Sequence, residues 1–199
     1  MLKQNNLFRG VTLLLLVLLS GCSQSDGYST SEVASKEEPI VIHGYTLPPE
    51  PDPVINNSTL LGIDSNNNGV RDDVEIWILK KYKDKHPIYT EIAMQAGRAW
   101  QKVLEDPSKA RETTKLMEAA QFCSFYFEFD AIKYGDTLLI DESIVTNRMF
   151  EKTVTNTQER KDAYWEYDRL LSGGVYVLPK KSQEKSYCDF NVTKFTKMK

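Results

Sequence analysis

The sequence predicts a mainly α-helical protein: a compact bundle of about five helices, with an extended proline-rich lead-in and at most short strands. Apolar residues repeat at helical spacing in successive segments after residue 71. The pairs His86-Pro87 and Asp106-Pro107 separate the first three of these segments. At 199 residues, with 41% apolar and 27% charged residues, the chain has the balance of one globular domain with a single core.

The first 21 residues differ from the rest and predict a signal peptide, residues 1–21. Lys3 and Arg9 precede a short apolar run, Val11 to Leu19, which ends in Leu19-Ser20-Gly21-Cys22. A membrane span needs about 20 apolar residues, so this run is too short to remain as an anchor. The ending resembles the lipobox of bacterial lipoproteins. That resemblance implies cleavage before Cys22 and lipidation of its thiol; an ordinary cleaved signal with an incidental cysteine is the alternative.

The lipobox resemblance also implies a place in the cell. More than one acyl chain gives stable membrane attachment, whereas a single chain binds only marginally. Ser23, rather than Asp, follows the cysteine, which favours the outer membrane, at its periplasmic face, in a source with two membranes. The expected partner is therefore the membrane, contacted through lipidated Cys22, with an envelope protein as a further partner.

Two segments precede the helical region. Residues 22–38 contain almost no apolar residues and predict a flexible tether. Residues 39–63 contain five prolines, and we expect them to be extended rather than helical, with a short strand at Ile40 to Ile42. The helical domain then covers residues 64–199 and begins with a loop of specific composition.

That loop, Asp64 to Glu75, reads D-S-N-N-N-G-V-R-D-D-V-E and matches a twelve-residue calcium loop. Gly69 falls at position 6, where the chain turns sharply. The alternative is plain turn chemistry in Asn-Asn-Asn-Gly with Asp72 as a helix cap, but a turn needs only two or three of these residues. The sequence therefore predicts Ca²⁺ as cofactor, with six ligand residues at positions 1, 3, 5, 7, 9 and 12: Asp64, Asn66, Asn68, Val70 (through its carbonyl), Asp72 and Glu75.

No helix is expected before the loop, since prolines and Asn56-Asn57 precede it. The stretch therefore resembles the EF-hand-like half-hand loops of dockerins and of uncharacterised exported bacterial proteins, a resemblance that covers about 14 residues and implies no activity. Sensor proteins change the angle between two helices. With one helix, we expect a structural ion of weak affinity, about 10⁻⁴ to 10⁻³ M.

Three helices are expected after the loop. The first runs from Asp72 to Lys83 with acids at its start and lysines at its end. The second starts at Pro87. The third covers roughly residues 108–129, forms a tight antiparallel pair with the second, and ends in an aromatic cluster that we expect to be buried, with a pocket for a greasy ligand as the alternative reading.

The last third predicts two more helices. Asp141 is expected to cap a fourth helix that runs through Phe150, and Asn156 with Glu159 resembles the capping box of a fifth. Gly173-Gly174 ends the fifth helix, and a short strand is expected at residues 175–178. With Cys22 assigned to lipid, Cys123 and Cys188 remain in an exported chain and are expected to form a disulfide; a reactive thiol is the alternative.

Charge and chemistry exclude some functions. The formal net charge is −3 and there is no basic stripe, so nucleic-acid binding is not expected. His43 and His86, the two histidines, belong to no triad or zinc cluster. The sequence favours a lipid-anchored binding or structural module of the cell envelope. The alternative is an envelope hydrolase that uses paired carboxylates such as Glu128-Asp130 or Asp141-Glu142, with calcium stabilising the fold.

Overall fold

A computed structural model of the protein describes residues 38–174 and 177–196. The expected signal peptide, the lipidation site Cys22 and all but the last residue of the tether lie outside these residues. The first half of the strand expected at 175–178 lies outside them too, and its described half, 177–178, is not a strand. The described residues belong to one compact unit, Glu38–Lys199. The residues expected as a lead-in, 39–63, are therefore part of this unit.

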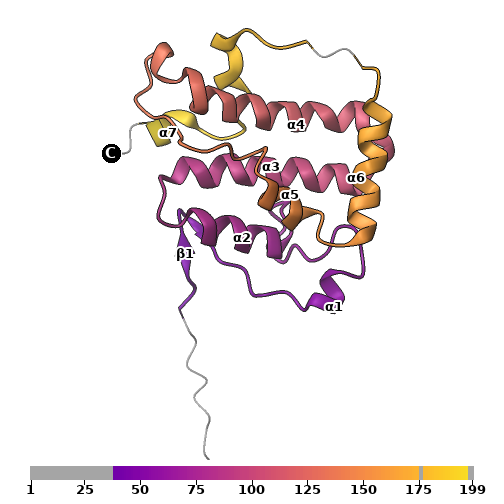
Figure 1. The fold of residues 1–199 in the computed structure, drawn as a ribbon. Coiled ribbons are helices and arrows are strands. Elements are labelled where there is room, and N and C mark those ends of the chain that lie inside the picture. Colours follow the sequence, from indigo (N-terminus) through magenta and orange to yellow (C-terminus); the bar gives the residue numbers. More distant parts are fainter. Residues whose placement is uncertain (1–37, 175–176, 197–199) are drawn as a thin grey trace, which may run out of the picture. The chain divides into compact units, whose positions relative to one another are not determined.

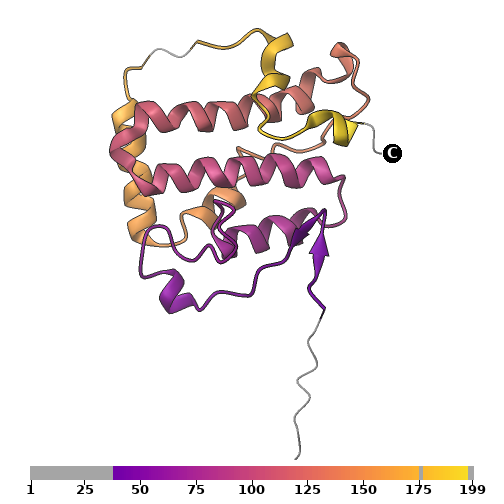
Figure 2. The same cartoon turned by 180° about the vertical axis from the view of Figure 1, so that it is seen from behind.

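Three long helices form the body of the unit: α2 (Asp72–Tyr82), α3 (Pro87–Glu105) and α4 (Ala110–Phe125). They lie one above another, with α3 in the middle, and α3 and α4 run antiparallel (Figure 1). α6 (Gln158–Leu171) crosses one end of the α3–α4 pair, and α5 (Arg148–Val154) packs against α2. The view from behind shows the same arrangement (Figure 2). The mainly α-helical fold is thus confirmed.

The boundaries of the first helices follow from local chemistry. His86 caps α3 by accepting from the backbone N–H of Ile88, and Pro87 occupies the first turn, where its missing N–H costs nothing. Asp106 caps the short 3₁₀ turn Pro107–Lys109 that leads into α4. After α4 the chain continues as one turn of π-helix, Tyr126–Asp130, and a 3₁₀ turn, Ile132–Tyr134. The third expected helix is therefore present, with a wider last turn.

The only strands in the described residues form a hairpin, β1 (Val41–Ile42) with β2 (Tyr45–Thr46), paired antiparallel with Val41 opposite Thr46. His43 and Gly44 between them both have positive φ, as the tightest hairpin turns require. The hairpin is held on α3, since His43 contacts the Thr90 hydroxyl at 2.7 Å and the Tyr45 hydroxyl donates to Glu91 at 2.9 Å.

Four sequence expectations are corrected. A short helix, α1 (Pro53–Asn56), interrupts the lead-in, because Pro53 stands at its first position and Asp52 accepts from the N–H groups of Val54 and Ile55. Asp141 caps no helix: its carboxylate accepts from Lys85 and Tyr89, and α5 starts later, capped by Asn147.

Thr157, rather than Asn156, caps α6, because Asn156 bonds to two arginines. The aromatic cluster is only partly core. Phe122, Tyr126 and Phe127 are buried, but Phe129 is 64% exposed.

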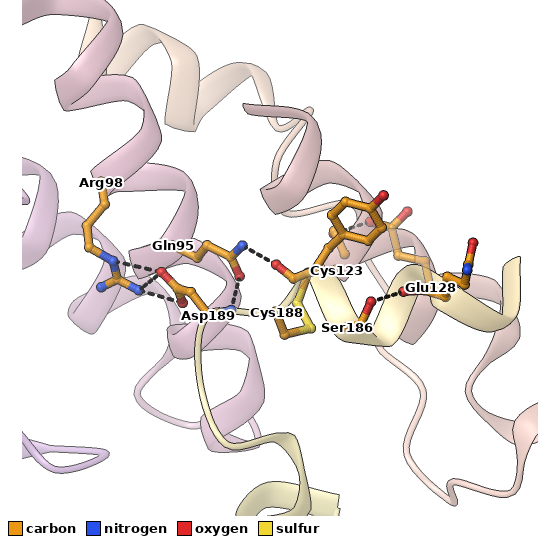
Figure 3. Close-up of a disulfide and its surroundings, with 10 residues drawn as sticks. Gln95, Arg98, Cys123, Glu128, Ser186, Cys188 and Asp189 are labelled. Carbon is orange, nitrogen blue, oxygen red and sulfur yellow. Dashed lines mark hydrogen bonds and ion pairs between the residues drawn. A yellow bond between two sulfur atoms is a disulfide. The ribbon is translucent and has the colours of Figure 1, made fainter. Parts of the chain in front are cut away.

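The core gathers around α3. Val74, Ile78 and Tyr82 of α2, at spacings of four, are buried together against Ile92 and Ala96 of α3. The C-terminal part consists of a 3₁₀ segment, Lys181–Tyr187, and α7 (Val192–Thr196). A disulfide joins Cys123 of α4 to Cys188, as expected from the sequence. Gln95 and Arg98 of α3 hold the residues beside it: Gln95 donates to the Tyr187 carbonyl, and Arg98 pairs with Asp189 (Figure 3).

Candidate metal site

The loop Asp64–Glu75 wraps tightly before α2. Asn67 and Gly69 both have positive φ, at 56° and 83°, and they curl the chain around the Asp64 side chain. The backbone N–H groups of Asn68 and Gly69 donate to the two carboxylate oxygens of Asp64, at 3.1 and 2.9 Å. Position 1 of the expected ligand set is thus oriented by the backbone of positions 5 and 6.

The side chains of positions 3, 5 and 12 meet. The carboxamides of Asn66 and Asn68 both donate to one oxygen of Glu75, at 3.0 and 2.8 Å. Their own oxygens accept from the N–H groups of Asn68 and Val70. An ion bound by these carboxamides would compete with the hydrogen bonds, which is consistent with weak affinity.

Two buried carboxylate oxygens of the loop have no hydrogen-bond partner among the described residues. They are Asp72 Oδ2 and Glu75 Oε1, and both side chains are fully buried. The other oxygen of Asp72 accepts from the N–H of Ser65. Buried carboxylates are normally hydrogen-bonded, paired with a cation or bound to a metal. Two unpartnered oxygens at positions 9 and 12 of one loop fit the chemistry of a hard cation.

The electrostatics of the loop point the same way. Burial raises the pKa of Glu75, and the carboxylates of Asp72 and Asp64 raise it further, although the Asn66 and Asn68 carboxamides oppose this. The three carboxylates thus share a poorly solvated space in which negative charge is unfavourable without a cation. However, no group of three or more His, Cys, Asp or Glu side chains in residues 38–174 and 177–196 is placed so that it could hold a metal ion by itself. A metal site in this loop would therefore also need the side chains of Asn66 and Asn68 and the carbonyl of Val70.

Packing against α3 fixes the middle of the loop. Val70 is fully buried and lies against Gly97, where a Cβ atom would come within 3.0 Å of the Val70 side chain. A Cβ on Gly69 would lie 3.3 Å from the Arg98 side chain. The loop is therefore seated on α3 as well as joined to α2. Position 7, the expected carbonyl ligand, belongs to the core.

Position 8 has a role that the sequence did not reveal. Arg71 has no exposed surface; it pairs with Asp73 and donates to the carbonyls of Val154 and Thr153 at the end of α5. Arg160 of α6 is equally buried and holds the residues before the loop, donating to the carbonyls of Asn56, Thr59 and Leu60. Their partners are about 80 to 100 positions away in the chain, so no local pattern could identify them.

The carboxylate pairs expected for a hydrolase are engaged elsewhere. Glu128 accepts from the hydroxyls of Ser124 and Ser143, and Asp130 pairs with Lys181. Asp141 pairs with Lys85, and Glu142 with Lys81. These acids therefore connect elements of the fold.

Neither models of protein families, nor curated proteins, nor solved structures give a match to the chain. None of the helices in the described residues combines the length and hydropathy that crossing a membrane requires.

Proposed function

We propose that the protein is a lipid-anchored binding or structural module of the cell envelope that holds one structural Ca²⁺ in the loop Asp64–Glu75. The observation that carries the calcium proposal is the pair of buried, unpartnered oxygens on Asp72 and Glu75. The ion would be held by the side chains of Asp64, Asn66, Asn68, Asp72 and Glu75 and by the carbonyl of Val70.

A structural role fits better than a signalling role. Only one helix, α2, adjoins the loop, so an ion has no helix pair whose angle it could change. The loop is also seated on α3 through Val70 and Gly97. A bound ion would neutralise the loop carboxylates and fix the junction between the N-terminal residues and α2.

Titration calorimetry on the unlipidated chain tests the calcium proposal. We expect binding with a Kd of about 10⁻⁴ to 10⁻³ M, lost in Asp64→Ala and in Glu75→Ala. Asp84→Ala is the matched control, since this acid lies outside the loop and its side chain is 87% exposed. No calcium-dependent heat in the wild-type chain, or equal loss in the control, would contradict the proposal.

The membrane anchor is proposed from Leu19-Ser20-Gly21-Cys22 alone. We expect the wild-type chain to sediment with membranes and to incorporate a labelled fatty acid. Cys22→Ala should abolish the label and release the chain. Label that persists in Cys22→Ala would show that the acyl group is elsewhere.

The preference for a binding module over a hydrolase rests on the acids that the hydrolase alternative would use. Their carboxylates are already engaged in hydrogen bonds and ion pairs within the fold.

A further inference from the structure

Two adjoining cavities lie where α6 meets α3, α4 and α5. We call the cavity that Trp100 lines the inner cavity and the one that Trp165 lines the outer cavity. Their volumes, about 360 and 510 Å³, are within the usual range of ligand sites. They share two lining residues, Glu151 and Tyr164. We call the two cavities together the α6 groove. Its lining includes six aromatic or polar side chains that could contact a ligand: Trp100, Glu118, Gln121, Glu151, Tyr164 and Trp165.

Aromatic rings follow one another along the groove. The ring centres of Trp100 and Tyr164 are 4.8 Å apart, and those of Tyr164 and Trp165 are 6.2 Å apart. Trp100 is buried in the inner cavity, whereas Trp165 borders the outer cavity and is 64% exposed. An exposed indole beside a cavity offers a flat apolar face to a ligand that can stack on it.

Two side chains that line the inner cavity carry buried N–H groups without partners. The indole N–H of Trp100 and the carboxamide nitrogen of Gln121 are buried and find no acceptor among the described residues. Trp100 itself is only 4% exposed. The same cavity is lined by Glu118 and Glu151, whose carboxylates make no hydrogen bond or ion pair within residues 38–174 and 177–196.

These groups require both an acceptor and a donor. Trp100 and Gln121 offer N–H groups, whereas Glu118 and Glu151 offer oxygens. A hydroxyl group satisfies both kinds at once, because it accepts through its lone pairs and donates its proton. A ligand rich in hydroxyls, with a flat C–H face for stacking on an indole, is a saccharide.

The outer cavity adds positive charge. Arg148, Lys152 and Lys161 line it together with one acid, Glu151, and none of the three cations has a carboxylate partner in the described part of the chain. An apolar peptide helix would bury these cations without compensation, whereas a sugar acid would pair with them. From these observations we propose that the α6 groove binds an anionic saccharide chain, with hydroxyls in the inner cavity, a sugar ring on Trp165 and a sugar carboxylate at the lysines.

The test uses the full chain after removal of residues 1–21, with Cys22→Ser so that no lipid is attached. It is titrated with trigalacturonate, with N-acetylglucosamine trimer and with maltotriose, and followed by tryptophan fluorescence and calorimetry. We expect the uronate to bind most tightly, with an affinity that falls as salt is raised. Trp165→Ala should weaken binding at least tenfold, and Lys152→Glu with Lys161→Glu should remove the preference for the uronate.

Phe129→Ala is the matched control, because Phe129 is exposed to the same extent, 64%, but lies outside the groove. Its affinity should equal that of the wild type. The proposal is overturned if none of the saccharides binds, or if Trp165→Ala leaves the affinity unchanged. It is equally overturned if hexaglutamate competes with the uronate at the same concentration, since the groove would then recognise charge alone.

Discussion

Gly62 is the residue on which the two buried arginines converge. It has a φ of 64°, and a Cβ atom there would lie 2.3 Å from Arg71 Cδ and 2.9 Å from Arg160 Nη2. Both guanidinium groups are fully buried and donate to backbone carbonyls, so neither can withdraw without breaking hydrogen bonds. Burial, followed by the nearby charge of Arg71, lowers the pKa of Arg160 to about 10, and the guanidinium stays charged at neutral pH.

Gly62→Ala should therefore be much more destabilising than Gly44→Ala. Gly44 also has a positive φ, of 90°, but no atom lies within 4 Å of the position of its Cβ. Both variants incur the left-handed backbone strain of about 1 kcal/mol, and only Gly62→Ala adds overpacking, worth about 1 to 3 kcal/mol more. Urea unfolding measures both free energies; equal losses would show that the arginines adapt.

At the scale of the elements, the C-terminal segment depends on side chains from two helices. The Cys123–Cys188 bond attaches it to α4, and Gln95 and Arg98 attach it to α3. The Arg98–Asp189 pair is partly exposed and contributes at most about 1 kcal/mol. The covalent bond therefore contributes more to holding the segment than this ion pair does.

Replacing both cysteines by alanine should lower the free energy of unfolding by about 4 kcal/mol, from the entropy of the closed loop in the unfolded chain. The bond spans 65 positions. Reductant should lower the free energy of unfolding of the wild type by a similar amount and leave that of the double variant unchanged. A wild type that does not respond to reductant in its unfolding transition would refute the contribution.

A second element-scale prediction concerns pH. Glu184, in the segment Lys181–Tyr187, is 6% exposed, and one of its oxygens has no partner among the described residues. Burial raises its pKa, and Asp130 raises it further, although Lys181 opposes this. The pKa of Glu184 is higher in the folded chain than in the unfolded chain, so ionisation of Glu184 lowers the free energy of unfolding. The full reduction is present at pH values above the folded pKa, and it disappears below the unfolded pKa of about 4.3.

Glu184→Gln should therefore be more stable than the wild type at pH 7. The difference in melting temperature should shrink as the pH falls to about 3.5. Glu166→Gln, on the exposed face of α6, is the control: the hydrogen bond from Arg169 lowers the pKa of Glu166 and outweighs the effect of burial, so this shift is opposite to that of Glu184. A Glu184→Gln variant that is less stable than the wild type at pH 7 would contradict this account.

At the scale of the whole molecule, the sequence predicted what depends on neighbours in the chain. The helical repeats of residues 72–83, 87–105 and 108–129 and the proline breaks between them are local, and the structure has helices there. The composition of the loop Asp64–Glu75 is local as well. The prediction that Asp141 and Asn156 cap helices is wrong because both side chains are engaged in other hydrogen bonds. Asp141 accepts from Lys85 and Tyr89, and Asn156 accepts from two arginines. Most of these partners are remote in sequence.

The groove could not be predicted for the same reason. Its side chains come from α3, α4, α5 and α6, between residues 100 and 165, and none of them stands in a pattern that distinguishes it from core or surface. In the sequence, Trp100 and Tyr164 occupy ordinary apolar positions of their helices. Only their meeting across the fold, with unpartnered donors beside them, points to the proposed site.

Because Cys123 is buried, its disulfide must form before the protein has finished folding. This cysteine has no exposed surface in the folded protein, so an oxidant or a disulfide-exchange enzyme cannot reach it once α4 has packed. Its partner Cys188 lies 65 positions further along the chain. The bond must therefore form after residue 188 has been added to the chain but before α4 has packed, and a chain that packs too early stays reduced.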